Sequence, residues 1–442
     1  MRNYFGDDVF LSGKTALGLY ERCAKGLPII DYHCHLNPEC IAKDEKLGDL
    51  ARLWLESDHY KWRLMRICSV DERYITGDAP GEEKFKKFAE ILPLAAGNPV
   101  YYFAQLELKE LFGITAPLCA ANAEKIYGEA SAVLENYTYS SIMNKFSVKY
   151  VATTDDPADS LEYHSPARPV FPTYRPDRAF AGDKNFICEL ERACGFEISS
   201  LKDFKRALEK RLDYFMAKGC GFSDHSFESL PSVFAADGEA EKLFALKERG
   251  KAETEALNGN ILMFLAEKYA ERKIVMQLHL SPLRNVSGTG FALSGRDSGY
   301  DVMGDVLSVK PLAAFLDKLE RRGALPQTLV YTLNPAAHEA VACLSGAFKG
   351  VRLGAAWWFN DSLSGIDRHL GVLEEYSALG AFPGMLTDSR SPASYVRFDF
   401  FRRILCSRIA EAVESGRYPE EHAEALIQKV CYGNAAELAG LK

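Results

Sequence analysis

Short apolar, β-branched runs that end in a polar or charged cluster recur along the chain. The first is PIIDYHCH at 28–35, and the second is VKYVATTDDP at 148–157. Each has the length of a buried strand, and its polar end marks where a strand would leave the core. Six further runs of this kind lie at 167–177, 218–226, 272–281, 327–335, 350–361 and 383–390.

The intervals between these runs carry the spacing of amphipathic helices. ISSLKDFKRALEKRLDYFMAK precedes the fourth run and KPLAAFLDKLERRGAL precedes the sixth, and both have apolar residues three or four positions apart. Eight buried strands that alternate with helices describe an α/β fold, the (β/α)8 barrel of the TIM type, as one catalytic domain over residues 1–442. In that fold, binding and reacting side chains gather at the C-terminal ends of the strands.

One interval, 37–147, is longer than a single crossover needs. LGDLARLWLESDHYKWRLMRIC, EEKFKKFAEILPLAA and NPVYYFAQLELKELFGI within it all have helical periodicity. A structureless loop of this length is rare inside a compact domain. We therefore expect residues 37–147 to form a helical insertion that follows the first strand and covers the active-site face.

Composition narrows the class of protein. The 442 residues are 47% apolar and carry a formal net charge of −8, without a long Lys/Arg cluster, which argues against nucleic acid or a membrane surface as a partner. The 11 cysteines form no CxxC pair, the N-terminal residues lack the apolar core of a signal peptide, and no apolar run reaches the length of a membrane span. These features favour a reduced, cytoplasmic protein.

The first strand ends in a histidine pair with the spacing of metal ligands. Residues i and i+2 of a strand share one face, so His33 and His35 can converge while Cys34 faces away. Imidazole nitrogens about 2.0–2.1 Å from an ion are ordinary zinc ligands. Asp388 ends the eighth run and would lie beside the first strand in a closed barrel, which makes it the best-placed third ligand. The alternative is that both histidines are polar residues hydrogen-bonded to backbone at a strand end.

Seven motifs occur in order along the chain: PIIDYHCHLNPE, DHYKWRLMR, ITGDAPGEEKF, GNPVYYFAQLEL, QLHLSPLRN, AWWFND and GMLTDSRSPASYVRFDFFRRILC. Together they resemble the uronate isomerase family of the amidohydrolase superfamily, and the likeness extends to YGNAAEL near the C-terminus. The resemblance implies a barrel with a helical insertion, one divalent metal ion (usually zinc) and a homo-oligomer. It also implies interconversion of D-glucuronate with D-fructuronate and of D-galacturonate with D-tagaturonate, in hexuronate catabolism.

The same resemblance implies a set of site residues. His33, His35 and Asp388 match the metal ligands, and His59 matches a further position of the site. The other matching active-site positions are Tyr60, Arg175, Asp224, His279 and Arg390. Ser226, Ser281, Pro392 and Phe398 differ from the residues expected at their positions, where the family has glycine twice, a larger apolar residue and a histidine. These differences bear on substrate preference rather than on the class of reaction.

The chemistry of aldose–ketose isomerisation requires such residue types. A base must remove the proton at C2 while a positive charge stabilises the developing enediolate. Asp388, Arg390, Tyr60 and His279 are the candidates for this step, and the sequence does not single out the base or exclude a hydride shift. His279 has the alternative of being a core histidine.

The carboxylate of a uronate is best bound by a planar, bidentate arginine. Arg175 is the first candidate and Arg284 the second, although Arg175 could instead pair with Asp177 on the surface. Asp224 is a further substrate-binding candidate, unless it caps a helix. Alternation at the seventh strand brings one residue of the tryptophan pair inward, and Trp358 is the candidate for the wall of the site.

Two other functions fit parts of the pattern. A zinc hydrolase on the same barrel would use a metal-bound hydroxide, but binuclear versions need a lysine at a central strand end, and FSDHS and QLHLS have none. A sugar-acid-binding protein without activity would rarely need a metal beside acid–base groups. Hydrolysis of esters or amides, or tight uronate binding without turnover, would distinguish them.

Overall fold

The strands form a parallel sheet in two sections. The computed structural model describes residues 3–165, 168–180 and 184–441. In one section the order is β1 (Ile29–Asp31), β2 (Val148–Ala152) and β3 (Val170–Phe171); in the other it is β10 (Val351–Leu353), β9 (Thr328–Thr332), β6 (Val275–Leu280), β5 (Phe222–Phe227) and β4 (Thr173–Tyr174). Every neighbouring pair within the two sections is parallel. A small antiparallel pair, β7 (Pro282–Leu283) and β8 (Val302–Met303), follows β6.

The third predicted strand joins the two sections. It is split into β3 and β4 at Pro172, which has no N–H to donate to a ladder. β3 pairs with β2, whereas β4 pairs with β5. The first residue of the predicted run, 167, lies outside the described residues. The parallel order therefore continues from β1 through β2, β3, β4, β5, β6 and β9 to β10, as the barrel prediction requires.

The prediction of a regular eighth strand over residues 383–390 is wrong. No strand is assigned within these described residues. Gly384 and Asp388 have φ of 80° and 47°, which are not β conformations, and the Thr387 N–H donates to the side chain of Asp31 instead of to a ladder. Two backbone hydrogen bonds still connect the segment to the residues after β1: Asp388 N to His33 O at 3.1 Å and His35 N to Ser389 O at 2.9 Å. Segment 383–390 takes the place of the eighth strand and closes the (β/α)8 barrel without regular strand structure.

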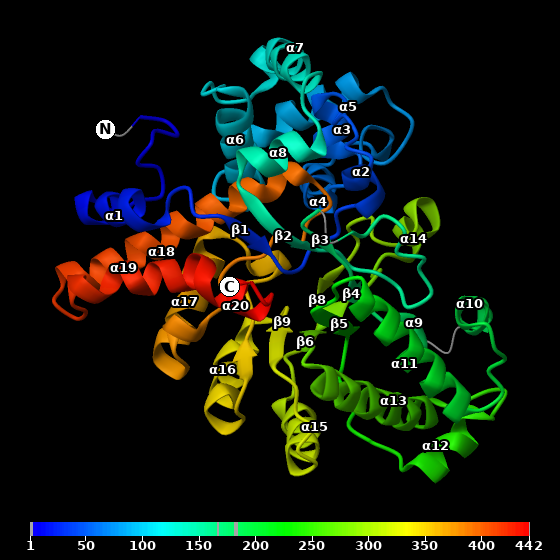
Figure 1. The fold of residues 1–442 in the computed structure, drawn as a ribbon. Helices are drawn as coiled ribbons and strands as arrows, with labels where there is room; N and C mark the ends of the chain where they lie inside the picture. The colour runs from blue at the N-terminus through cyan, green and yellow to red at the C-terminus, as the bar shows by residue number, and fades with distance from the viewer. Residues whose placement is uncertain (1–2, 166–167, 181–183, 442) are drawn as a thin grey trace.

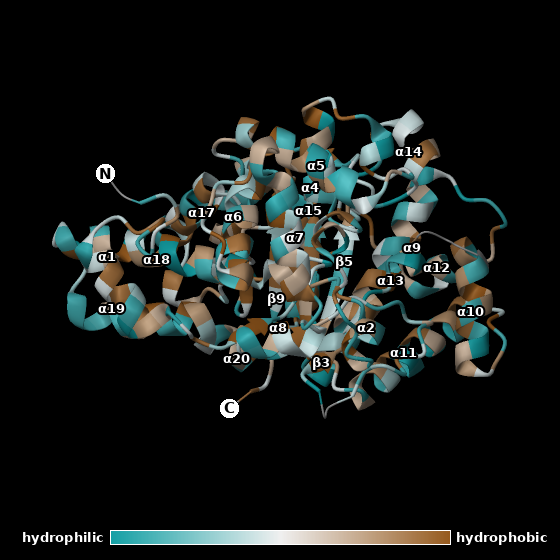
Figure 2. Ribbon diagram, turned by 90° about the horizontal axis from the view of Figure 1, so that it is seen from above, coloured by the Kyte–Doolittle hydropathy of each residue, from teal (hydrophilic) through white to brown (hydrophobic). Residues whose placement is uncertain are grey.

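Helices surround the strands (Figure 1; Figure 2). The two predicted from periodicity, α11 (Leu201–Ala217) and α15 (Val309–Arg321), are present and bury one apolar face each. The remaining helices outside the 37–147 interval are α1 (Lys14–Leu19), α9 (Asp177–Phe180), α10 (Lys184–Cys194), α12 (Asp237–Phe244), α13 (Lys251–Arg272), α14 (Gly288–Ser294), α16 (His338–Ala347), α17 (Leu363–Tyr376), α18 (Val396–Glu414), α19 (Glu420–Gln428) and α20 (Asn434–Leu438). None of the described helices is both long and apolar enough to span a membrane.

Between β1 and β2 the described chain is helical and gathers at one end of the molecule (Figure 1). The run LGDLARLWLESDHYKWRLMRIC is interrupted, because the Asp58 carboxylate accepts the N–H groups of Tyr60 and Lys61 and starts a new helix. The cap places His59 and Tyr60 in the first turn of that helix. The helices are α2 (Pro38–Ala42), α3 (Leu50–Leu55), α4 (His59–Ile67), α5 (Gly81–Ile91), α6 (Pro99–Phe112), α7 (Ala123–Leu134) and α8 (Tyr139–Lys145).

The conformation of segment 383–390 depends on a glycine. A Cβ at Gly384, with φ of 80°, would lie 2.3 Å from the carbonyl oxygen of Val430. We expect Gly384→Ala to destabilise the protein by about 3 kcal/mol or more, because steric overlap adds to backbone strain. Gly416→Ala is the matched control: φ is 71° there, but nothing lies within 4 Å of the added Cβ, so about 1 kcal/mol is expected. Urea-unfolding midpoints of the two variants measure the difference, and equal midpoints would contradict this role.

Candidate functional site

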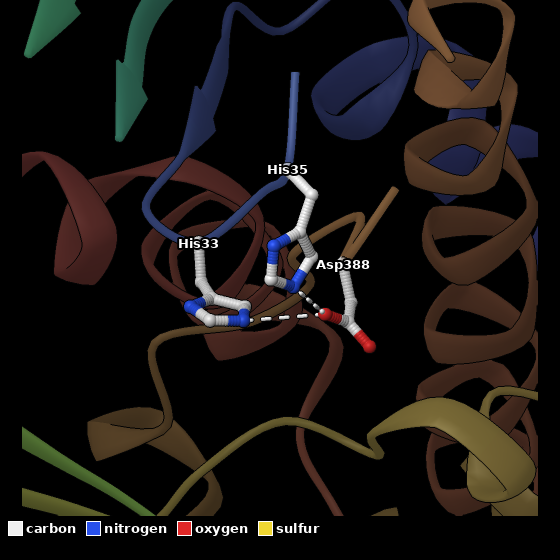
Figure 3. Close-up of side chains that lie close together, drawn as sticks. All are labelled: His33, His35 and Asp388. Carbon is white, nitrogen blue, oxygen red and sulfur yellow. Dashed lines mark hydrogen bonds and ion pairs between the residues drawn. The ribbon is translucent and has the colours of Figure 1, made fainter. Parts of the chain in front are cut away.

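Three side chains converge where the residues after β1 meet segment 383–390 (Figure 3). The Nε2 atoms of His33 and His35 lie 3.2 and 3.1 Å from the same oxygen, Oδ1 of Asp388. Cys34, between the histidines, is buried and is not part of this group. Two ligands about 2.1 Å from one tetrahedral ion stand about 3.4 Å apart, so the three atoms have the spacing that a shared cation requires.

Neighbouring side chains hold these ligands in place. Thr154 Oγ1 lies 2.7 Å from Nδ1 of His35, and the indole N–H of Trp357 donates to Oδ2 of Asp388 at 2.8 Å. Such contacts to the far atoms of ligands are typical of metal centres. Burial alone would raise the pKa of Asp388, but its contacts with the two histidines hold that pKa well below the usual value. An ionised carboxylate and two imidazoles fit a divalent cation.

A second group, His33, Asp224 and His279, also has ligand atoms close together. Its carboxylate is already neutralised, because Nη1 of Arg175 lies 2.9 Å from Oδ2 of Asp224. A fixed guanidinium at that distance opposes a bound cation. Of the two groups, His33, His35 and Asp388 are therefore the better candidates for a metal-binding group.

The metal-binding group opens into a cavity of about 260 Å³ at the C-terminal ends of the strands. Most of the predicted site residues lie on its wall, contributed by the barrel, by α4 and by the segment between β7 and β8. The cavity is lined by His33, His35, His59, Thr154, Arg175, Ser226, His279, Arg284, Asp297, Trp357, Trp358, Asp388 and Arg390.

Asp224 organises one side of this site from beneath the wall. It is fully buried and accepts the Nδ1 proton of His279 at 2.6 Å, beside its ion pair with Arg175. Burial opposes ionisation of Asp224, yet Arg175 and His279 hold its pKa well below the usual value. Burial also lowers the pKa of His279, which leaves a neutral imidazole with its proton on Nδ1. The Nε2 atom of His279 has no partner among the described residues.

Arg175 is more fully paired than the sequence indicates. Its Nε lies 2.9 Å from Asp177, the expected alternative partner, and its Nη1 is held by Asp224. Arg284 and Arg390 are the more available guanidinium groups of the cavity. Arg175 therefore fixes Asp224, and the other two arginines are the better candidates for binding an anion.

Both tryptophans of the AWWF motif reach the cavity, so the expectation that only one does is wrong. Trp357 packs edge-on against His279 with ring centres 4.6 Å apart. Trp358 starts a short 3-10 helix with φ of 53°, which breaks strand alternation and turns its ring onto His59, 5.5 Å away. The change of secondary structure directly after Trp357 is the reason that alternation fails here.

Tyr60 is placed differently from the expectation that it approaches the metal group directly. It is absent from the wall of the cavity that His33, His35 and Asp388 line, and its hydroxyl donates to Oδ2 of Asp361 at 3.3 Å. It lines an adjoining cavity of about 320 Å³, which shares His59 and Trp358 with the first. His59 is therefore the residue of α4 that the structure brings to the first cavity.

Several contributors were not identified from the sequence. Thr154 is the second residue after β2, and its position beyond a strand end is a usable signal. Asp297 lies in a glycine-rich loop without a periodic signal, whereas strand alternation favoured Trp358 over Trp357 for the wall. Ser281, where glycine was expected, has φ of 68°, a conformation that glycine adopts most easily.

Comparisons with known proteins identify the family of the chain. A model of the glucuronate isomerase family matches residues 1–438. The uronate isomerase of Caldanaerobacter subterraneus is 42% identical, with 100% of both chains covered. The uronate isomerase structure from Thermotoga maritima has a TM-score of 0.94 at 32% identity and covers 99% of this chain and 100% of its own. The glucuronate isomerase structure from Caulobacter crescentus has a TM-score of 0.92 at 26% identity, with 99% and 97% covered. By sequence and by fold, the chain belongs to the glucuronate isomerase family.

Proposed function

We propose that this protein is a uronate isomerase that interconverts D-glucuronate with D-fructuronate and D-galacturonate with D-tagaturonate. The observation that carries the proposal is the combination in one cavity of a cation-binding group, His33, His35 and Asp388, with the guanidinium groups of Arg284 and Arg390. The first suits the reacting oxygens of the sugar and the second suits its carboxylate. Family membership supports the same reaction.

Zinc is the proposed ion, because two imidazoles and a carboxylate with an open position are an ordinary catalytic zinc environment. When bound, it supplies positive charge that polarises the carbonyl and stabilises an enediolate. His33, His35 and Asp388 would hold it, with Thr154 and Trp357 fixing their orientation.

Arg284 and Arg390 bind the anionic substrate in this proposal. Arg284 stacks over Trp358 and donates to Ser226, whereas Arg390 has its described contacts with Asp297 alone. Arg390 is two residues from Asp388 in the chain and can also place its charge near the reacting oxygens. Tyr60 stays a proposed proton carrier between oxygens, because burial raises the pKa of its phenol well above the usual value and keeps it protonated.

His279 is the proposed group for moving the proton between C2 and C1. Asp224 fixes its proton on Nδ1, so Nε2 keeps a lone pair. The proton leaves C2 as the C2–H electrons form the enediolate double bond, and it returns to C1 as the C2 carbonyl forms. Loss of positioned acid–base catalysis typically costs about 10²–10⁴-fold in rate.

We expect His279→Asn to lower kcat on D-glucuronate by about 10²-fold or more. Asparagine can still donate to Asp224 from the position of Nδ1 but has no atom in place of Nε2. Steady-state kinetics, with zinc content and thermal midpoint measured on the same sample, check the result. A kcat within about twofold of wild type, with zinc retained, would exclude His279 from proton transfer.

The test of the proposed function is turnover of D-glucuronate and D-galacturonate beside D-glucose and D-galactose by the zinc-loaded protein. The isomerase converts the two uronates and leaves the neutral sugars largely unchanged, because they lack the carboxylate. Hydrolysis of esters or amides without uronate turnover would instead establish a hydrolase. No lysine is found among the described residues of the cavity wall, which argues against a lysine-bridged binuclear centre.

The proposal extends to the cellular setting. We place the enzyme in the cytoplasm, as a homo-oligomer, and assign the helices of 37–147 the role of covering the active-site face of a single barrel domain. His59 of α4 on the cavity wall supports that role for the insertion. Size-exclusion chromatography with light scattering would test the oligomer.

A further inference from the structure

An acidic residue, Asp297, stands at the mouth of the cavity among groups that would bind the substrate. It lies between α14 and β8, and its carboxylate is 56% exposed. It belongs to the wall of the cavity together with the two available arginines. A negative charge at this place is unexpected in a site for an anionic sugar, and neither the metal group nor the proposed proton transfer uses it.

The carboxylate of Asp297 is shared between Arg284 and Arg390. Nη2 of Arg390 lies 3.6 Å from Oδ2, and Nη1 of Arg284 lies 3.8 Å from Oδ1. Arg390 also donates from Nη1 to the backbone oxygen of Asp297 at 3.4 Å. A well-formed guanidinium–carboxylate contact is about 2.7–2.9 Å long, so both ion pairs are loose. A ligand carboxylate with bidentate geometry can therefore displace the Asp297 side chain.

The backbone around Asp297 is fixed, so the Asp297 carboxylate stays near the two arginines in the free protein. Asp297 has φ of 56°, in the left-handed region. The guanidinium of Arg66, on α4, donates to the carbonyl oxygen of Ser298 and stacks over the ring of Tyr300 at 4.1 Å. A Cβ on Gly299 would lie 3.1 Å from the backbone oxygen of His59. The loop is thus docked on the helix that carries His59.

Among the described residues Arg284 has other partners as well, and Arg390 does not. Asp301 lies 3.1 Å from Nη1 of Arg284, and Ser226 accepts from its Nη2 at 3.3 Å. The side chain of Asp301 is buried, so it stays with Arg284 when a ligand enters. For Arg390 the described contacts are those with Asp297. Displacing Asp297 consequently frees Arg390 entirely and Arg284 in part.

We infer that Asp297 is a specificity-determining residue: its carboxylate occupies the carboxylate subsite of the free enzyme and competes with the carboxylate of the sugar acid. The inference rests on the proposed function for the identity of the ligand. It follows that Asp297 reduces affinity for anions, so that an anion binds well only when its sugar chain also reaches the metal group. Although burial opposes ionisation of Asp297, Arg390 and Arg284 hold its pKa below the usual value, so it stays charged at neutral pH.

Calorimetric titration of the zinc-loaded protein with two non-reacting ligands tests the inference. L-Gulonate is D-glucuronate with its aldehyde reduced, and D-glucitol differs from L-gulonate only in lacking the carboxylate. In Asp297→Asn we expect L-gulonate to bind about tenfold more tightly, because two ion pairs of the competitor are lost, and D-glucitol to bind as in wild type. Asparagine tolerates the left-handed conformation, and Asp297→Gly, which favours it, should give the same result.

Asp317→Asn is the matched control, since it removes one negative charge from an exposed pair with Arg321 on α15. Its affinity for L-gulonate should equal that of wild type. Unchanged or weaker L-gulonate binding in both Asp297 variants, or equal tightening in Asp317→Asn, would overturn the inference. The titrations need no turnover, so failure of the wild-type protein to convert uronates would remove the proposed function without obscuring this result.

Discussion

Replacement of His35 by alanine is expected to remove the bound divalent cation and to lower uronate turnover by about 10³-fold. Only two of the proposed ligands, His33 and Asp388, would then remain, and the charge that stabilises an enediolate would be lost with the ion. Metal content by mass spectrometry and kcat/KM on D-glucuronate are measured on the same preparation. The two losses should occur together, because the described contacts of His35 are with Asp388 and Thr154 and not with Arg284 or Arg390, the arginines proposed to bind the carboxylate.

The control for this variant is His422→Ala. His422 lies on α19 with a largely exposed side chain, so its removal should leave both metal content and kcat/KM unchanged. Full turnover by His35→Ala after exhaustive chelation would show that the reaction does not depend on the metal group.

Arg397→Met is expected to destabilise the fold by about 3–5 kcal/mol. Arg397 is buried on α18, donates to Oδ2 of Asp361 at 3.2 Å and to the backbone oxygen of Thr387 at 3.0 Å, and lies between the rings of Tyr60 and Phe103. Methionine fills much of the volume but leaves the Asp361 carboxylate without a counter-charge in the interior. Burial raises the pKa of Asp361 to about 7 even beside Arg397. Urea unfolding at about pH 9 measures the loss, because at neutral pH a protonated Asp361 would hide much of the charge effect.

Two further variants separate charge from packing. Arg321→Met removes an exposed arginine from an i,i+4 pair and should change stability by no more than about 0.5 kcal/mol. Adding Asp361→Asn to Arg397→Met removes the uncompensated carboxylate and should recover part of the loss. If the double variant is as unstable as the sum of the singles, packing of Arg397 against the two rings, rather than its charge, accounts for the effect.

The parallel strands were predictable because a strand buried on both faces is a near-continuous apolar run. β6 and β9 have every residue buried and match this description. The run at 383–390, PGMLTDSR, has only a short apolar start before its polar end, and its conformation is set by Gly384, Asp388 and the hydrogen bonds that Thr387 donates to the Asp31 carboxylate. Composition does not reveal such tertiary contacts, so segment 383–390 was predicted as a strand.

The proposed metal-binding group, His33, His35 and Asp388, was also predictable, because it depends on regular strand geometry. Alternation along an extended chain brings His33 and His35 together, and barrel closure brings Asp388 beside them. The rest of the wall depends on geometry without a period. Asp297 comes from a loop, Trp358 from a 3-10 turn, and the pairing of Arg175 with Asp224 joins the ends of two different strands. Only coordinates reveal that Arg175 is occupied and that Arg390 faces Asp297.

The measurement that tests the central claim most directly is proton NMR of D-glucuronate and D-galacturonate incubated in D₂O with the zinc-loaded protein. The account predicts a ketose from the uronate with deuterium at C1, since His279 exchanges its proton with solvent during transfer from C2. A ketose without deuterium would keep the isomerase and replace proton exchange by a shielded proton or a hydride shift. No ketose from either sugar, with zinc shown to be bound, would contradict the account.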